Sequence, residues 1–114
     1  MGKHLQKDLD ILKKKILTMG SMVEEATNRA ISALIQRRED AAAEVLAGDD
    51  AIDEMENEIE DFVLKTLALH QPVAGDLRFV VMVLKFNHDL ERMGDLAANI
   101  AERTLELLRG ASLN

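Results

Sequence analysis

The sequence contains no cysteine, tryptophan or tyrosine, and it has a single proline. Without cysteine the chain can form no disulfide, no thiolate metal site and no cysteine nucleophile, so its stability must come from packing. Three phenylalanines are the only aromatic residues, and the core must therefore be built from Leu, Ile, Val, Met and Ala. One proline in 114 residues leaves room for long helices, and we predict an all-α protein.

Basic charge and long apolar runs are also scarce. The 14 Lys and Arg are outnumbered by 21 Asp and Glu, which gives a formal charge of -7, so we expect no nucleic-acid surface. The N-terminal stretch "MGKHLQKDLDILKKKIL" interrupts every apolar run with Lys or Asp. It predicts neither a signal peptide nor a membrane span, so we expect a cytoplasmic protein with no direct membrane insertion.

Apolar residues recur at alternating steps of four and three along three stretches, which is typical of helices packed on neighbours. The predicted helices cover residues 3–37, 40–69 and 76–109, with Asp40 and Asp76 as the N-caps of the second and third. Pro72 and Gly75 break the pattern between the last two. Because the connections are short, neighbouring helices should be antiparallel, and we predict one domain, residues 1–114, folded as an up-down-up three-helix bundle.

The third helix carries a polar row within an apolar segment. Its predicted core seam consists of Phe79, Val83, Phe86, Leu90, Met93, Ala97, Ile100, Thr104 and Leu107. At about 100° per residue, a second set centres nearly opposite this seam: His88, Glu91, Asp95, Asn99 and Glu102. The simplest interpretation of this row is a solvated face on an acidic protein.

Two features favour a binding site instead. Glu91 and Asp95 are like charges one turn apart, a pairing that costs a few tenths of a kcal/mol and that a cation would offset. Carboxylates suit hard or borderline cations such as Mg, Ca, Mn or Fe. The start of the same face carries Leu77, Val81 and Leu84, so we expect another domain or another copy of the chain to cover it.

The other polar residues give weaker signals. The acidic run "DDAIDEMENEIED" in the second helix places Asp49 and Asp53 one turn apart, but most of its members, including Glu56, are expected to be solvated. His70 is expected to be structural, whereas His88 could join a site at Glu91. No catalytic triad setting, phosphate-binding loop or zinc-protease motif is present, so we expect no enzyme.

The segment "LHQPVAGDLRFVVMVLKFNHDLERMGDLAANIAE", residues 69–102, resembles the signature of the PhoU family of phosphate-signalling regulators. "LAGDDAIDEMENEIED" and "MVEEATNRAISAL" are similar to the patterns of that family's other helices. The resemblance implies a three-helix bundle that family members usually carry twice. This chain has one such repeat, whether as part of a longer protein or as a natural single repeat, and a two-fold homodimer would restore a paired arrangement.

The resemblance also implies a site and partners. The family's metal motif falls on Glu91 and Asp95, with Asp89 and Asn99 as flanking positions, and its second-helix motif falls on Asp49 and Asp53. The implied ligand is a divalent or trivalent metal, Fe, Mn, Zn or Mg, often iron in multinuclear clusters. The implied role is negative regulation of phosphate uptake and of the phosphate-starvation response, linking the ATP-binding subunit of a phosphate ABC transporter to a sensor histidine kinase.

Two alternatives lack a metal role. The chain could be a structural helical interaction module whose acidic rows are only solvated. It could also be a regulatory appendage of another ion or phosphate transporter.

Overall fold

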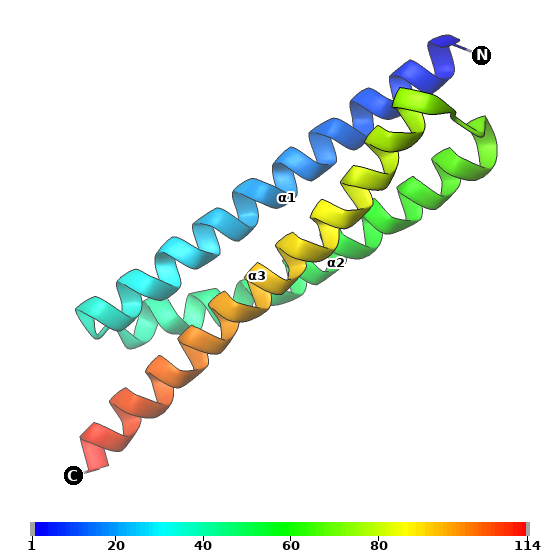
Figure 1. Cartoon of the computed structure of the whole chain (residues 1–114). Coiled ribbons are helices and arrows are strands. Elements are labelled where there is room, and N and C mark those ends of the chain that lie inside the picture. Colours follow the sequence, from blue (N-terminus) through cyan, green and yellow to red (C-terminus); the bar gives the residue numbers. More distant parts are fainter. Residues whose placement is uncertain (1, 114) are drawn as a thin grey trace.

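Three long helices form the protein in a computed structural model that describes residues 2–113, with side chains described for residues 4–110. They are α1 (Gly2–Gln36), α2 (Glu39–His70) and α3 (Ala74–Leu113). The helices run up, down and up as an elongated bundle of 65 × 18 × 17 Å (Figure 1). The all-α, antiparallel three-helix fold expected from the sequence is confirmed.

The turn between α1 and α2 is made by two arginines. Arg37 has a positive φ of 55°, and the N–H of Arg38 donates to the carbonyl of Ala33 at 2.9 Å, which closes the end of α1. The prediction that Asp40 caps α2 is wrong, because the N-cap position is held by Arg38, which makes no side-chain cap bond. Asp40 instead lies in the first turn and accepts a hydrogen bond of 2.8 Å from Arg38 Nη2.

The turn between α2 and α3 is closed by a left-handed residue followed by a buried proline. Gln71 has φ 46°, and its N–H donates to the carbonyl of Leu67 at 3.1 Å. Pro72 then ends the helix, as expected, and is itself buried. Asp76 is not the N-cap of α3, since the helix begins two residues earlier at Ala74; Asp76 lies in the first turn, where the helix dipole favours an acid.

The open end of the α1–α2 hairpin is joined by a hydrogen bond between a histidine and a carboxylate. His70, at the end of α2, has a side chain that is only 6% exposed, and its Nε2 lies 2.7 Å from Oδ2 of Asp8 on α1. This contact ties residues 62 positions apart in the sequence. His70 is therefore a structural residue, as its position in the turn suggested.

The core is divided into two clusters along the bundle axis. The larger cluster occupies the half that contains both the start of α1 and the start of α3, and its buried members are Leu9, Leu12, Met19, Val23, Ile52, Ile59, Val63, Val80 and Val83. The smaller cluster is built mostly of alanine and contains Ala30, Ala33, Ala42, Val45, Ala97, Ala101 and Leu105. The bundle is thus packed with large aliphatic side chains in one half and with small ones in the other.

The predicted seam of α3 is wrong at several positions. Phe86, Met93 and Leu107 are 51%, 48% and 62% exposed. The buried positions that the pattern missed are Val80, Asn87, Gly94, Ala101 and Leu105. The four-and-three spacing selected a row that contains large apolar side chains, whereas the buried face also includes the small or polar residues Asn87, Gly94 and Ala101, which let α3 approach the other helices closely.

Gly94 marks the closest of these approaches. A Cβ atom at this position would lie 3.2 Å from Cγ2 of Ile52 on α2 and 3.9 Å from Cγ2 of Val23 on α1. Few Cβ contacts in proteins are as short as 3.2 Å, so α3 could not sit this close to α2 with a larger side chain unless Ile52 moved. The glycine therefore sets the distance between α2 and α3 at mid-bundle.

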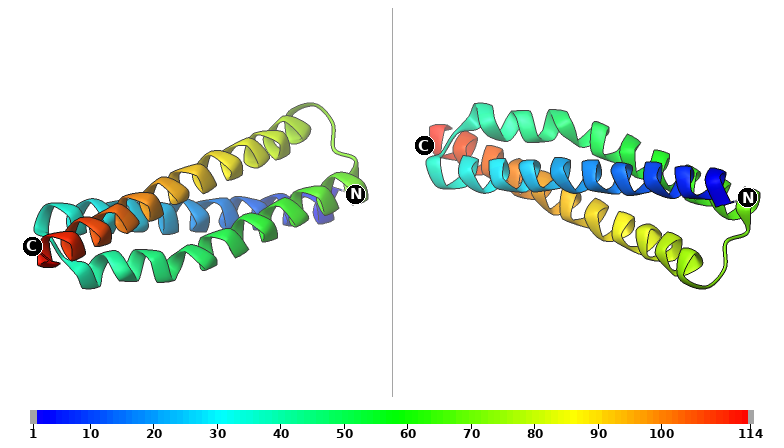
Figure 2. Two further views of the ribbon diagram at one scale, coloured as in Figure 1. Left: turned by 90° about the horizontal axis from the view of Figure 1, so that it is seen from below. Right: turned by 90° about the horizontal axis from the view of Figure 1, so that it is seen from above.

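The start of α3 is exposed on its outer side, although Val80 and Val83 on its inner side are buried in the larger core cluster. Both views in Figure 2 show α3 diverging from α1 and α2 toward its N-terminal end. Consistent with this, Leu77, Val81 and Met82 are 39%, 37% and 44% exposed, while Leu84 packs against the larger core cluster. None of the helices within residues 2–113 has an apolar stretch long enough to cross a membrane.

Candidate metal site between α2 and α3

Three carboxylates from two helices converge next to Gly94. Asp49 and Asp53 lie one turn apart on α2, and Asp95 projects from α3. One carboxylate oxygen from each lies within 4.8 Å of those of the other two. Asp95 lies more than 40 residues after Asp49 and Asp53 in the sequence. The fold therefore brings together three of the residues predicted as metal ligands.

Glu91 adds a fourth carboxyl group to this cluster. It lies one turn before Asp95, and its pKa is raised from 4.5 to about 7 by a hydrogen bond with Asp95, then by partial burial, and then by the negative charges of Asp95, Glu56 and Asp53. Glu91 is therefore about half protonated near neutral pH. It can release its proton when a cation arrives, because a cation favours the ionised form.

Asp49 experiences the same accumulation of charge. Burial raises its pKa above 3.8, and the neighbouring charges of Asp53, Asp95 and Asp50 raise it further. No lysine or arginine is paired with these carboxylates among the ion pairs of residues 4–110. The cluster therefore holds excess negative charge that its own protein does not neutralise.

The donor set fits a hard or borderline cation. Carboxylate oxygens are the ligands preferred by Mg²⁺, Mn²⁺ and iron, and carboxylates on adjacent turns can bridge two ions. Asp49, Asp53 and Asp95 are each only partly covered or exposed, so an ion could bind them and keep water ligands. This arrangement could hold a metal at the surface of the bundle.

The two flanking positions differ in their relation to the cluster. Asn99 lies one turn beyond Asp95, is exposed, and lines a shallow depression with Arg92, Asp95 and Leu96. Asp89 is also exposed, but at about 100° per residue it points some 120° away from Asp95 around the helix. Asn99 can therefore reach the same surface as Asp95, whereas Asp89 faces another direction.

The acidic row does not point directly away from the core. The sequence placed it opposite the predicted seam, but the true contact face contains Asn87 and Gly94, which rotates the buried side toward Glu91. As a result the row lies on the flank of α3 that faces α2. This rotation is what allows Asp95 to meet Asp49 and Asp53.

Glu56 and His88 extend the polar contact between the helices. Glu56 is not simply solvated, since its side chain is 20% exposed and its Oε2 lies 3.7 Å from Nδ1 of His88. One turn before Glu91, buried Asn87 donates from Nδ2 to the backbone carbonyl of Glu56 at 2.9 Å. The sequence contained a pattern that could have placed Glu56 beside the metal-site candidates. Asp49, Asp53 and Glu56 repeat at steps of four and three and so share one face of α2.

The fold and this cluster define a class of protein: an antiparallel three-helix bundle with an acidic cluster between its second and third helices. The family model described as PhoU domain matches residues 16–104, and the chain belongs to this family. The matched region contains the whole acidic cluster and the turn between α2 and α3.

Similar proteins agree with this assignment. The chain is 45% identical over 103 residues to the phosphate-specific transport system accessory protein PhoU homolog of Aquifex aeolicus, covering 90% of this chain and 47% of that protein. It is 41% identical over 104 residues to homolog 1 of Thermotoga maritima, covering 91% of this chain and 45% of that protein. The crystal structure of PhoU from Pseudomonas aeruginosa superimposes with a TM-score of 0.89 at 36% identity.

The chain spans about half the length of the relatives it matches. In the Pseudomonas structure the match covers 92% of this chain and 50% of the other. The fold is therefore that of about half of such a protein, and these relatives are named as accessory proteins of the phosphate-specific transport system.

We predict that Glu91→Gln stabilises the metal-free protein at pH 8 but not at pH 4.5. Glu91 binds its proton more tightly when folded than when unfolded, so the free energy of unfolding falls as pH rises from 4.5 through about 7. Glu91→Gln should therefore raise the free energy of unfolding at pH 8 by about 1 kcal/mol after allowance for solvent screening. Urea unfolding in EDTA measures it, with exposed Glu106→Gln as the control; an equal gain at both pH values would contradict the prediction.

Proposed function

We propose that this chain is a metal-binding regulatory module of phosphate transport. The observation that carries the metal role is the convergence of Asp49, Asp53 and Asp95 within 4.8 Å, with Glu91 beside them. These residues would hold Fe, Mn, Zn or Mg as divalent or trivalent ions. Their all-oxygen chemistry favours Mg, Mn or Fe over Zn, which usually takes nitrogen or sulfur ligands in structural sites.

Metal removal and substitution should identify the ligands. We predict that Mn²⁺ or Fe²⁺ raises the melting temperature of the EDTA-treated protein, and that Asp53→Asn and Asp95→Asn each reduce this shift by more than half because each removes one charged ligand. Asp89→Asn should retain the shift, because Asp89 faces another direction. Exposed Asp61→Asn is the charge-matched control.

The readouts are a thermal melt followed by circular dichroism and elemental analysis of the purified protein. If Asp61→Asn and Asp95→Asn lose the shift equally, the metal binds the acidic surface without a defined site. If no metal stabilises the protein, the chain is a helical interaction module whose carboxylates are only solvated.

The family and the names of its members support the regulatory role in this proposal. Relatives at 34–45% identity are described as accessory proteins of the phosphate-specific transport system. We propose that this chain contacts the ATP-binding subunit of a phosphate ABC transporter and a sensor histidine kinase, and that it lowers phosphate uptake and starvation signalling. These partners place it in the cytoplasm, and the role needs no catalytic group of its own.

Co-purification tests the partners. We predict that the chain elutes with the ATP-binding subunit of its own organism's phosphate transporter and with the cytoplasmic part of the sensor kinase encoded with it. The ATP-binding subunit of an unrelated ABC transporter is the matched control. Equal retention on both subunits would contradict a specific role in phosphate transport.

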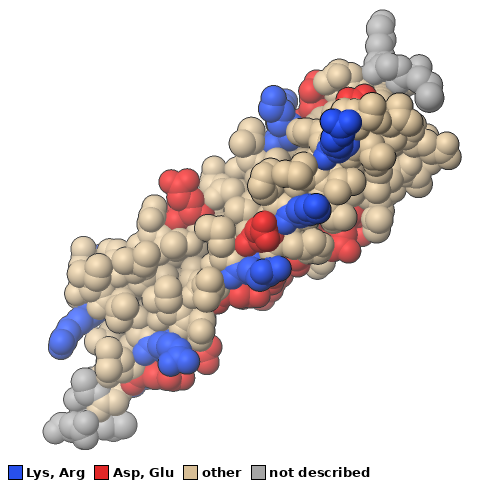
Figure 3. Space-filling model, viewed as in Figure 1, with Lys and Arg blue, Asp and Glu red and all other residues tan. Residues whose placement is uncertain are grey.

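The exposed start of α3 supports a homodimer. Leu77 and Val81 lie on neighbouring turns, with Met82 and Phe86 beside them, and all four are more than a third exposed. In the space-filling view, acidic side chains gather along the lower edge of the molecule, several Lys and Arg side chains stand across the face, and the surface between them is uncharged (Figure 3). A two-fold axis near this segment would let each copy cover the apolar residues of the other.

Sedimentation velocity tests this arrangement. We predict that the wild-type chain sediments as a dimer and that Leu77→Glu with Val81→Glu gives a monomer, because two charges would then be buried without partners. Leu17→Glu, at a residue of α1 that is 63% exposed, is the control and should remain dimeric. A wild-type protein that stays monomeric at high concentration would contradict the homodimer.

A further inference from the structure

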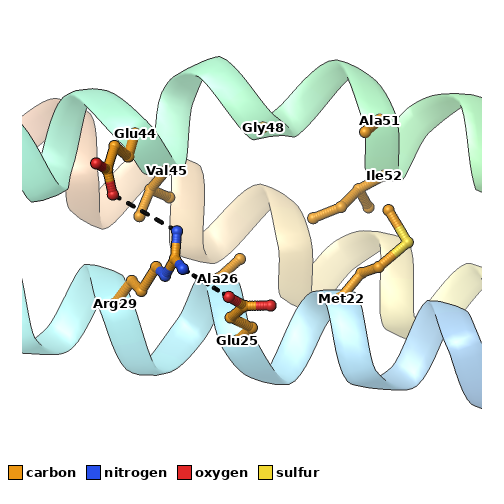
Figure 4. A pocket seen from close by; sticks show the side chains of 9 residues that line it. All are labelled: Met22, Glu25, Ala26, Arg29, Glu44, Val45, Gly48, Ala51 and Ile52. Carbon is orange, nitrogen blue, oxygen red and sulfur yellow. Dashed lines mark ion pairs between the residues drawn. The ribbon is translucent and has the colours of Figure 1, made fainter.

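A groove between α1 and α2 is separate from the acidic cluster. It has a volume of about 220 Å³. Met22, Ala26, Val45 and Ile52 form its apolar part, while Gly48 and Ala51 form the upper wall on α2 (Figure 4). The groove opens on the α1 side of α2, whereas the acidic cluster lies on the α3 side.

The groove arises because the core is interrupted at this level. Val45 belongs to the smaller core cluster and Ile52 to the larger one. Between them on the same helix stands Gly48, where an added Cβ would meet no atom within 4 Å. The absence of a side chain at Gly48 thus leaves space beside apolar groups, in contrast to Gly94, where the absence is needed for packing.

The size of the groove favours one side chain over a free small molecule. Sites for drug-sized ligands commonly measure about 300–1,000 Å³, more than this groove provides. A large aliphatic or aromatic side chain would fit, and a groove between two antiparallel helices is a surface on which a third helix can lie.

The charges around the groove favour a basic occupant. Arg29 stands at one end between two carboxylates, with Nη2 2.7 Å from Glu25 and Nη1 3.5 Å from Glu44 (Figure 4). The single positive charge of Arg29 is therefore shared between two carboxylates, which leaves this end of the groove with a net negative charge. Glu24 continues the acidic surface along α1, and the α2 wall belongs to a helix with five Asp, six Glu and one Lys.

We propose that this groove docks a basic amphipathic helix of a partner protein. One large apolar side chain of that helix enters beside Gly48, and Lys or Arg one turn away pairs with Glu25 and Glu44. The inference gives the chemistry of a partner for the accessory role proposed above, and it is independent of the metal site.

A pair of synthetic peptides tests the proposal on the full chain. One is an amphipathic helix of Leu and Lys with Leu at positions i, i+3, i+4 and i+7, and the other has Glu in place of every Lys. Fluorescence anisotropy of labelled peptides measures their affinities. The Leu–Lys peptide should bind and the Leu–Glu peptide should bind at least tenfold more weakly.

Filling the groove separates docking from general attraction to an acidic protein. Gly48→Leu places an apolar side chain in the groove and should weaken the Leu–Lys peptide about tenfold, equivalent to about 1.4 kcal/mol. Gly20→Leu is the matched control, since Gly20 lies within α1 away from the groove and an added Cβ there also meets nothing within 4 Å. Ala51→Leu narrows the groove from a second position on the same α2 wall and should repeat the loss.

The charged rim gives an independent readout. Glu25→Gln with Glu44→Gln should weaken the Leu–Lys peptide, because it removes two carboxylates and frees Arg29 to repel Lys. Glu106→Gln on α3 is the control and should have no effect.

The proposal is overturned if Gly48→Leu and Ala51→Leu, with unchanged circular dichroism, bind the Leu–Lys peptide as tightly as Gly20→Leu does. It is also overturned if the wild-type chain binds neither peptide or binds both equally. Metal-dependent melting of Gly48→Leu should match that of wild type. Failure of the groove and failure of the metal role are therefore distinguishable.

Discussion

The close approach of α3 to α2 at Gly94 is the constraint on which the arrangement of the other residues depends. With no side chain at this position, the α3 backbone lies against Ile52, and a Cβ would be only 3.2 Å from that side chain. The next residue, Asp95, is thereby carried to Asp49 and Asp53 on α2. One packing contact therefore fixes both the spacing of two helices and the geometry of the acidic cluster, so a substitution that disturbs one disturbs the other.

The cluster is electrostatically unfavourable until something neutralises it. Burial and neighbouring charges raise the pKa of Asp49, and Glu91 retains a proton to about pH 7 because it is hydrogen-bonded to Asp95 and surrounded by acids. One basic residue beside these carboxylates would reduce the repulsion between them, if the repulsion served no purpose. The structure instead offsets the repulsion with aliphatic packing beside Gly94, from Val23 and Ile52, and with the Asn87 bond to α2.

Two sides of α2 carry different features. Its α3 side carries the carboxylates, while its α1 side carries the groove beside Gly48. Relatives in the PhoU family are named as accessory proteins of the phosphate-specific transport system. A metal and a basic partner bound on two different sides of α2, as proposed above, would not compete for the same surface.

The three helices, their antiparallel order and the spacing of acids within each helix could be predicted from the sequence, because helical periodicity and turn residues are local properties. It also pointed to Asp49, Asp53 and Asp95, through spacing and through the family resemblance. Only the tertiary structure decided how α3 is rotated, burying Asn87 and Gly94 while leaving Phe86 and Met93 exposed. That rotation depends on side-chain volumes on three helices at once, which no single helical pattern contains. The tertiary structure also decided that Glu56 joins the polar contact between α2 and α3, that Asp89 faces away from the acidic cluster, and that the groove beside Gly48 stays open.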